Sequence, residues 1–450
     1  MNPGVLGYAS YLPRYRLGGN DIGIRGDRVV AAFDEDSTTM AVAAAGQIVT
    51  SSAAPPVLYF ATSTPAYADK NNASAIHAAL GLPSNVLCAD MCGTGRSAFA
   101  SMAAATHTGG VAVAADVRVG RPGSADEKLG GDGAAALLFG DGDVIAEVLG
   151  MHSLTEEFLD RWREPTAITG QQWEERFGGQ RYAALIRRAA AEALDSAGIA
   201  DPDHVVLACP NAGVLKRAGS LVKGNKGVTT PAAGFGGAAD AMIALCGTLD
   251  VAGPDETILL LSATDGCDAM VLRTTAWLPR SRQRCALEQQ RHGGLPVPHL
   301  TYLSWRGLVA LEPPRRPEPE RAAAPPAARA GGWKFGFAGS RCRVCGFLHL
   351  PPTRVCRSCG AADDMDTVPV AGLRGTIVTY TVDRLAFSPS PPMLQAVIDV
   401  DGDGRCTLEV ADARAEELSV GARVRFSFRR LFTAGGVHDY FWKAVLDDAE

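Results

Sequence analysis

The stretch CADMCGTGRSAFASM, residues 88–102, places Cys92 directly before a glycine-started, alanine-rich segment with the composition of a helix. A cysteine at a helix N-terminus faces unpaired backbone N–H groups and the positive end of the helix dipole, which lower the pKa of the thiol. The same N–H groups can hold the oxyanion that forms when a thioester carbonyl is attacked. The position alone fits a nucleophile and a buried structural cysteine alike, and both interpretations stay open at this point.

A dinucleotide-binding turn is a second interpretation of the same stretch. Gly93, Gly95 and Ala98 have the spacing of the G-x-G-x-x-A fingerprint. Asp116 closes the next apolar stretch, at about the place of the carboxylate that holds a ribose. Asp90 argues against this interpretation because it interrupts what should be a continuous buried strand. A lone glycine fingerprint is weak evidence, so the dinucleotide interpretation is set aside.

Four further cysteines have the spacing of a metal site. In CRVCGFLHLPPTRVCRSCG, two C-x2-C pairs are separated by ten residues, and each pair is followed by glycine. Two such knuckles present four thiolates in the tetrahedral array that Zn²⁺ prefers, and a four-thiolate site is closed and therefore structural. His349 lies between the pairs, but a full set of cysteines makes it unnecessary as a ligand. The predicted zinc ligands are Cys342, Cys345, Cys356 and Cys359.

Length and pattern predict the elements that position these residues. A chain of 450 residues is too long for one domain, since single cores stop growing at about 250 to 300 residues. Upstream of a stretch rich in proline and arginine, strand-like runs alternate with helical patterns, which favours an α/β architecture with largely parallel central strands. Short strands with Gly- and Asp-rich turns follow the cysteines and favour a small β-barrel. The predicted parts are an α/β domain at 1–312, a linker at 313–332, a zinc ribbon at 333–370 and a barrel at 371–450.

Composition excludes several classes of protein. Hydrophobic residues make up 47% and charged residues 20%, which is typical of a globular protein. The net charge of −6 offers no footprint for nucleic acid, and no run of about 18 apolar residues could span a bilayer. The N-terminal stretch lacks the basic and apolar regions of a signal peptide, so a cytoplasmic location is expected. In that reducing compartment, the 11 cysteines indicate ligands, nucleophiles or core residues rather than disulfides.

The upstream region also repeats its own pattern. VLYFATSTP and HVVLACPNA are each a buried strand that runs into a polar turn. Further along each half, GVAVAADVR and TILLLSATDG are again similar to each other, and each is a strand of the same sort. Two similar halves are expected of a duplicated fold.

Several stretches resemble archaeal-type hydroxymethylglutaryl-CoA synthases. ADVRVGRPGSADE followed by GGDGAAALLFG is similar to the segment after the active-site cysteine, and LDVAGPDETILLLSATDG and YLSWRG are similar to later landmarks. The resemblance covers most of residues 1–312 and implies the duplicated thiolase-like fold shared with type III ketoacyl-ACP synthases. It also implies that Cys92 accepts the acyl group of a coenzyme A thioester. Its own N–H and a turn around Asp265 and Gly266 are then the candidate oxyanion donors.

The chain departs from that family within the catalytic set. Ser63 stands where the synthase has a catalytic Glu, Ala208 where it has the His of His-Gln-Pro-Asn, and Phe235 near a later Asn, whereas Pro210 and Asn211 are retained. Carbon–carbon bond formation needs a base or an enolate-stabilising donor, which Ala and Phe cannot supply, while acyl transfer needs less. The resemblance implies an acyltransferase or condensing enzyme in which Asn211 and Ser63 orient the substrate. A non-catalytic scaffold for a separate thiolase and a retro-aldol enzyme acting on a hydroxyacyl-CoA are the alternatives.

The C-terminal pattern resembles a second family. A zinc ribbon followed by a barrel, over residues 333–445, is similar to the OB-fold proteins with rubredoxin-like ribbons that accompany acyl-CoA thiolases and synthases. This resemblance implies acyl-CoA handling and a thiolase partner, and the synthase-like half implies a homodimer. In RVRFSFRRLF, alternation sends Val424, Phe426 and Phe428 to the core, so nucleic-acid binding is not expected. Arg425 on the other face, together with Arg217, is a candidate contact for coenzyme A phosphates.

Overall fold

The computed structural model of the chain describes residues 3–49, 54–312, 316–319 and 330–447. Residue contacts divide it into two compact units, which are taken separately below. Most of the predicted linker at 313–332 lies outside the described residues, and the boundary at 312 remains a proposal. The first unit comprises Met1–Ala31, Asp36–Ser74 and Pro83–His299, and the second comprises Ala32–Glu35, Ala75–Leu82 and Leu300–Glu450.

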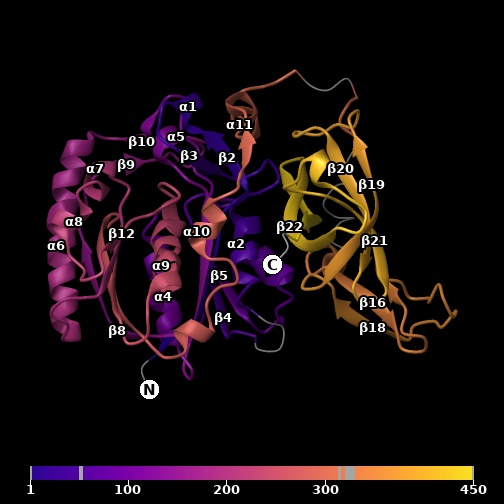
Figure 1. Cartoon of the computed structure of the whole chain (residues 1–450), viewed down its shortest axis with the longest axis horizontal. Coiled ribbons are helices and arrows are strands. Elements are labelled where there is room, and N and C mark those ends of the chain that lie inside the picture. The colour runs from indigo at the N-terminus through magenta and orange to yellow at the C-terminus, as the bar shows by residue number, and fades with distance from the viewer. Residues whose placement is uncertain (1–2, 50–53, 313–315, 320–329, 448–450) are drawn as a thin grey trace. The chain divides into compact units, whose positions relative to one another are not determined.

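The first unit is built on a ten-stranded sheet (Figure 1). Its strands are β1 (Gly4–Tyr11), β4 (Val57–Thr62), β5 (Leu87–Cys92), β6 (Gly110–Asp116), β7 (Gly133–Gly140), β8 (Ala146–Thr155), β11 (His204–Ala208), β12 (Val228–Thr229), β13 (Thr257–Ser262) and β14 (Gly266–Thr274). Five of them run in the order β5-β4-β6-β7-β1, and the others mirror that order as β12-β11-β13-β14-β8. The repeated sequence patterns fall on β4 with β11 and on β6 with β13. The predicted duplication is therefore confirmed.

Parallel pairing is confined to the outer strands of each half. β4 pairs in parallel with β5 and β6, and β11 pairs in parallel with β12 and β13. The middle strands β7, β1, β8 and β14 pair antiparallel, so the expectation of largely parallel central strands is wrong there. The connections explain the difference, because parallel neighbours need a crossover. The helix α4 (Ser97–Thr108) lies in the crossover from β5 to β6 and α9 (Asp240–Val251) in the crossover from β12 to β13, whereas only residues 263–265 join β13 to β14.

Apolar residues on both faces of the sheet bury it between helices. Along β13, Ile258 and Leu260 join the core that contains residues of α4 and α9, while Leu259 and Leu261 join a core with α6 (Glu175–Ala197). This alternation follows from the two-residue period of a strand. Figure 1 shows α6 on the outside of the unit and α4 and α9 in its interior. Among the described residues, no helix has the length and hydropathy needed to cross a membrane.

Shorter elements complete the first unit. A three-stranded sheet has the order β15-β2-β3, and β9 pairs with β10. Their bounds are β2 (Tyr15–Gly18), β3 (Asp27–Val30), β9 (Arg161–Trp162), β10 (Gln171–Gln172) and β15 (Leu295–Val297). The remaining helices of this unit are α1 (Gly19–Ile22), α2 (Ser37–Ala45), α5 (Ala125–Leu129), α7 (Ala212–Leu215), α8 (Ala218–Leu221), η1 (Gly237–Ala239), η2 (Leu278–Arg280) and α10 (Leu287–Arg291). Most of α3 (Ala73–Ala79) and of α11 (His299–Trp305) belongs to the second unit.

The second unit contains a small sheet and a five-stranded barrel, with the strand orders β17-β16-β18 and β21-β20-β19-β22-β23. A parallel bridge from Val410 to Ala444 brings the chain after β21 to β23, so the barrel is nearly closed. Val424, Phe426 and Phe428 are buried, as the alternation predicted. The elements are α13 (Gly331–Lys334), β16 (Ala338–Cys342), β17 (Leu348–His349), β18 (Met365–Pro369), β19 (Arg374–Asp383), β20 (Met393–Val400), β21 (Gly404–Glu409), η3 (Ala415–Glu417), β22 (Arg423–Ala434) and β23 (Val437–Leu446).

A buried network of ion pairs lies inside the second unit. Arg429 of β22 and Lys443 of β23 approach the carboxylate of Asp34 to 3.3 and 2.9 Å. Burial alone would raise the pKa of Asp34, but Lys443 and Arg429 hold it below its usual value. Removing one partner of such a pair costs about 3–5 kcal/mol because a buried charge is left uncompensated. The remaining members are Glu35, Glu409 and Asp412.

Candidate functional site

Cys92 is the last residue of β5, not the first residue of a helix. A turn at residues 93–96 separates it from α4, which begins at Ser97. The expected position at a helix N-terminus is therefore wrong. Pairing of β5 with β4 continues to the end, where Cys92 lies opposite Thr62 and the Gly93 N–H donates to the Thr62 carbonyl at 3.1 Å. Gly93 then turns the chain with a φ of +118°, which glycine adopts without strain.

The surroundings of Cys92 favour the thiol over the thiolate. Partial burial, with the nearby carboxylates of Asp90 and Asp116, raises its pKa to about 11. The lowering expected from a helix dipole is absent because the helix starts several residues later. The side chain is nevertheless accessible and lines a cavity of about 330 Å³ together with Cys88 and Lys70. An attacking Cys92 must therefore lose its proton in the course of the reaction.

Two turns are held against each other beside Cys92. Thr94 Oγ1 donates to Asp265 Oδ2 at 2.5 Å, and the Arg96 guanidinium donates to the Asp265 carbonyl at 2.9 Å. Arg96 also makes two bonds of 2.8 Å to the carboxylate of Asp268, a geometry that fixes orientation as well as distance. Asp265 and Gly266 have φ values of +51° and +131°. The turn predicted to donate to an oxyanion thus lies next to the turn that follows Cys92.

Asp116, at the end of β6, is completely buried and joins three segments. Its Oδ1 accepts from the hydroxyls of Thr62 and Thr64, both at 2.8 Å, and from the N–H groups of Ser63 and Thr64. Its Oδ2 accepts from Ser63 Oγ and from the Ala238 N–H, both at 2.7 Å. A carboxylate offers about four lone-pair sites, so none is left for a ribose. The dinucleotide interpretation is therefore wrong.

Ser63 is buried, and its hydroxyl is fully engaged. It donates its proton to Asp116 and accepts a bond of 3.0 Å from the Arg118 guanidinium. A hydroxyl has only one proton to donate, so Ser63 has none for a substrate in this arrangement. The Ser63 carbonyl accepts a further bond, at 2.6 Å, from Arg163.

Phe235 lies beneath two of the arginines that sequence reasoning missed. The guanidinium carbons of Arg118 and Arg161 are 5.0 and 4.6 Å from the centre of its ring, within the range of cation–π contacts. No local motif marks these arginines, because Arg118 follows β6 and Arg161 opens β9, and the two meet only in the folded chain. Ala208 is buried at the end of β11 and brings no polar group.

Asn211 has a structural task in this arrangement. Its Oδ1 accepts from the Val214 N–H at 3.0 Å and so caps α7, while its Nδ2 donates to the Glu175 carbonyl at 2.7 Å. These two hydrogen bonds argue against the prediction that the Asn211 side chain orients a substrate. Of the predicted phosphate contacts, Arg217 is exposed in the first unit, and Arg425 is half-buried on β22 in the second.

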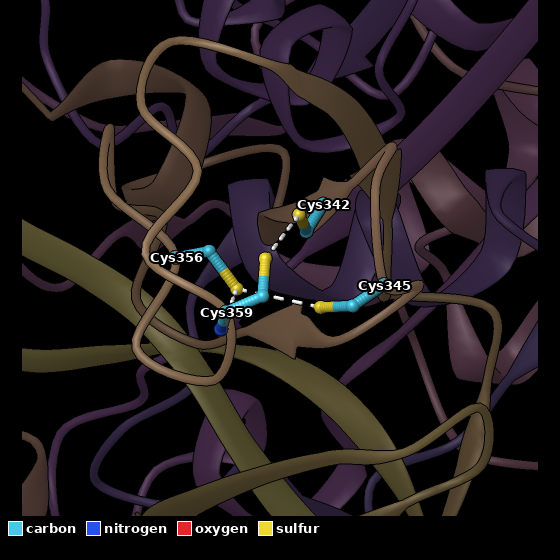
Figure 2. A group of neighbouring side chains, drawn as sticks. All are labelled: Cys342, Cys345, Cys356 and Cys359. Carbon is cyan, nitrogen blue, oxygen red and sulfur yellow. Dashed lines mark hydrogen bonds between the residues drawn. The ribbon is translucent and has the colours of Figure 1, made fainter.

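The four predicted zinc ligands converge at the end of β16 and in the loops that follow (Figure 2). Cys342 Sγ lies 3.7 Å from Cys359 Sγ, and Cys345 Sγ lies 3.5 Å from Cys356 Sγ. A tetrahedron with Zn–S bonds of about 2.3 Å separates its sulfurs by about 3.8 Å, so the sulfur positions fit this ion. Gly346 and Gly360 both have a φ of +77°, which gives the two knuckles the same turn. The four sulfurs would hold Zn²⁺ in a closed structural site, and His349 is not part of the cluster.

Each part of the chain is similar in sequence to known proteins. Over 310 residues, the chain is 28% identical to the hydroxymethylglutaryl-CoA synthase of Archaeoglobus fulgidus, covering 60% of the chain and 89% of the relative. It is 27% identical over 345 residues to the synthase of Pyrobaculum calidifontis, covering 68% and 98%. The family described as "ChsH2, C-terminal OB-fold domain" matches residues 367–429.

Solved structures show which fold the first unit has. An HMG-CoA synthase solved in complex with CoA matches with a TM-score of 0.59 at 15% identity, covering 70% of the chain and 92% of the match. The 3-oxoacyl-(acyl carrier protein) synthase III of Pseudomonas aeruginosa matches with a TM-score of 0.53 at 19% identity, covering 61% and 98%. The chain thus combines a thiolase-like fold with an OB-fold. Within the thiolase-like class, its N-terminal region resembles the archaeal hydroxymethylglutaryl-CoA synthases.

The zinc assignment predicts the metal content of the purified chain. Elemental analysis should find about one Zn²⁺ per chain, because a site of four thiolates binds tightly and supports the folding of a small ribbon. Cys356→Ser should lose the metal and unfold the ribbon while the first unit stays folded. Cys285→Ser, which changes a half-buried cysteine outside the cluster, should keep it. A zinc-free chain with an ordered ribbon would contradict the assignment.

The raised pKa of Cys92 predicts a steep pH dependence of its alkylation. Since only the thiolate reacts, the rate with iodoacetamide should rise roughly tenfold per pH unit from pH 7 and level off only near pH 11. Mass spectrometry of the peptide that contains Cys92 measures this rate, with a free cysteine peptide as the control. A profile that levels off at about pH 8.5 or below would show an ordinary or activated thiol instead.

Proposed function

We propose that the first unit is an acyl-CoA-dependent acyltransferase or condensing enzyme that carries its acyl group on Cys92. The observation that carries this proposal is the accessible thiol at the end of β5, beside the paired turns at 93–96 and 265–266. The hydroxymethylglutaryl-CoA synthases that the chain resembles support the substrate class, and one structurally similar synthase was solved with CoA bound. Zn²⁺ in the ribbon would be structural.

The chemistry is a thioester exchange. Cys92 Sγ attacks the carbonyl carbon of the acyl-CoA, a new C–S bond forms, and the bond to the coenzyme A sulfur breaks. The leaving thiolate takes up the proton that Cys92 gives up, so the exchange needs no external reductant or oxidant. Backbone N–H groups of the two turns are the candidates for holding the oxyanion of the intermediate.

Transfer is favoured over condensation by what surrounds the thiol. The Ser63 hydroxyl donates its hydrogen bond to Asp116, and neither Ala208 nor Phe235 has a group that could accept a proton or polarise a carbonyl. The acyl group would then pass to an acceptor that brings its own nucleophile. The raised pKa of Cys92 favours one second candidate, in which the unit binds coenzyme A thioesters as a scaffold for a thiolase without acylating itself.

Acylation of Cys92 is the direct test. Incubation of the chain with acetyl-CoA should add one acetyl mass to the peptide that contains residue 92, and Cys92→Ala should abolish the adduct. Cys88→Ala is the matched control, because Cys88 lies on the same strand and lines the same cavity. Condensation with a second acyl-CoA should be much slower than this acylation. Binding of acetyl-CoA without an adduct would reject the transferase and favour the scaffold.

A homodimer is proposed for the same unit. β5 ends the ten-stranded sheet, and Leu87 at its start is 63% exposed, so this edge presents unpaired backbone and an apolar side chain. Light scattering at micromolar concentration should give twice the mass of one chain, and Leu87→Lys should shift it towards the monomer. Val251→Lys, at an apolar position on α9 that is even more exposed (73%), should leave the mass unchanged. A wild-type monomer would contradict the pairing.

A further inference from the structure

Three arginines gather around Ser63 in the first unit. Arg118 follows β6 and donates to Ser63 Oγ, and Arg163 donates to the Ser63 carbonyl. Arg161 and Arg118 both make a cation–π contact with the ring of Phe235. Burial lowers the pKa of Arg118, and the positive charges of Arg161 and Arg163 add to the effect. Guanidinium groups that lie close together in a partly buried site repel one another unless nearby negative charge compensates them.

The charges of Asp116 and Asp126 offset part of this repulsion, but among the described residues no carboxylate forms a hydrogen bond or an ion pair with the Arg118 side chain. Asp126 is engaged by Arg161 at 2.6 Å and by Gln172 at 2.5 Å. Asp116 is charged and close, but its bonds come from hydroxyl and backbone donors and none comes from Arg118. Asp240 is fully buried, which raises its pKa to about 8 and leaves it largely protonated at pH 7. Within the described part of the chain, the Arg118 guanidinium has one hydrogen-bond partner, the neutral hydroxyl of Ser63.

The strand ladder connects the partner of this guanidinium to the proposed nucleophile. Ser63 directly follows Thr62, and Thr62 is the residue that pairs with Cys92 across the β4–β5 ladder. The residue that binds the Arg118 guanidinium is therefore one residue along and one strand across from Cys92. Phe235 supports the flat face of the guanidinium, which limits its motion and orients its remaining N–H groups.

We propose that Arg118 binds a carboxylate on the acyl chain of the substrate. The acyl-CoA would then be the half-thioester of a dicarboxylic acid, not a simple fatty acyl-CoA. A guanidinium suits this task because its parallel N–H groups match the two oxygens of a carboxylate. Arg161 and Arg163 add a positive field that favours the anion. The inference rests on the proposed function, since it assumes that Cys92 accepts the acyl group.

Binding of two thioesters to the Cys92→Ala chain, which cannot be acylated at residue 92, tests the inference. Calorimetry with succinyl-CoA and pentanoyl-CoA compares an acyl chain that ends in a carboxylate with one of similar length that does not. The succinyl thioester should bind roughly tenfold more tightly, as expected for hydrogen bonds to a charged group. Adding Arg118→Met should remove most of this preference and leave the affinity for pentanoyl-CoA unchanged.

Two further variants complete the design. Arg118→Lys keeps the charge but loses the parallel N–H groups, so it should retain part of the preference even if the Met variant folds poorly. Arg121→Met is the matched control, because Arg121 lies on the same loop, is exposed and donates only to the Thr169 hydroxyl at 3.3 Å. It should keep the full preference.

The outcomes separate this inference from the proposed function. Equal binding of both thioesters to the Cys92→Ala chain would overturn the carboxylate site and leave the acyl-CoA proposal standing. A loss of affinity for both thioesters in Arg118→Met would also overturn it, because Arg118 would then bind a phosphate of coenzyme A. If neither thioester binds at all, the proposed function is overturned and this inference with it.

Discussion

The first unit depends on one buried carboxylate. An ionised group in the interior of a protein is tolerated only when hydrogen bonds replace its lost hydration, and Asp116 is supplied with donors from the end of β4 and from the start of the 3₁₀ turn η1. The contact is close enough to restrict the sequence, since a Cβ at Gly237 would lie 2.1 Å from Asp116 Oδ2. The carboxylate of Asp116 therefore holds the end of β6 against the end of β4, which is the strand that pairs with Cys92.

The same carboxylate shapes the chemistry that is available to Cys92. Burial and the carboxylate of Asp90 raise the pKa of Cys92 most, and the fixed negative charge of Asp116 adds to the effect. The arginines around Ser63 bring positive charge next to the same carboxylate. Under the proposed function, this local balance of charge would influence which acyl groups the unit accepts.

The features that the sequence predicted correctly are local ones. Strands of the repeated halves were visible because buried apolar runs and polar turns recur, and the zinc knuckles because C-x2-C-G encodes its own turn. Features that depend on pairing between distant segments were not visible. The antiparallel middle of the sheet, the extension of β5 through Cys92 and the engagement of Asn211 by Glu175 each require knowledge of which segments become neighbours. Arg118 was missed for the same reason, since its partner Ser63 lies 55 residues away in the chain.

The second unit is not one continuous piece of polypeptide, because Ala32–Glu35 belongs to it together with the C-terminal region. Asp34 and Glu35 provide counter-charges for Arg429, and Asp34 does so for Lys443 as well. A gene fragment that encoded only the ribbon and barrel would separate these two bases from acids near the other end of the chain. Recombination between related genes is thereby constrained: an exchanged C-terminal region would have to arrive with a matching tetrapeptide some 400 residues upstream, or with neutral residues in place of its buried bases.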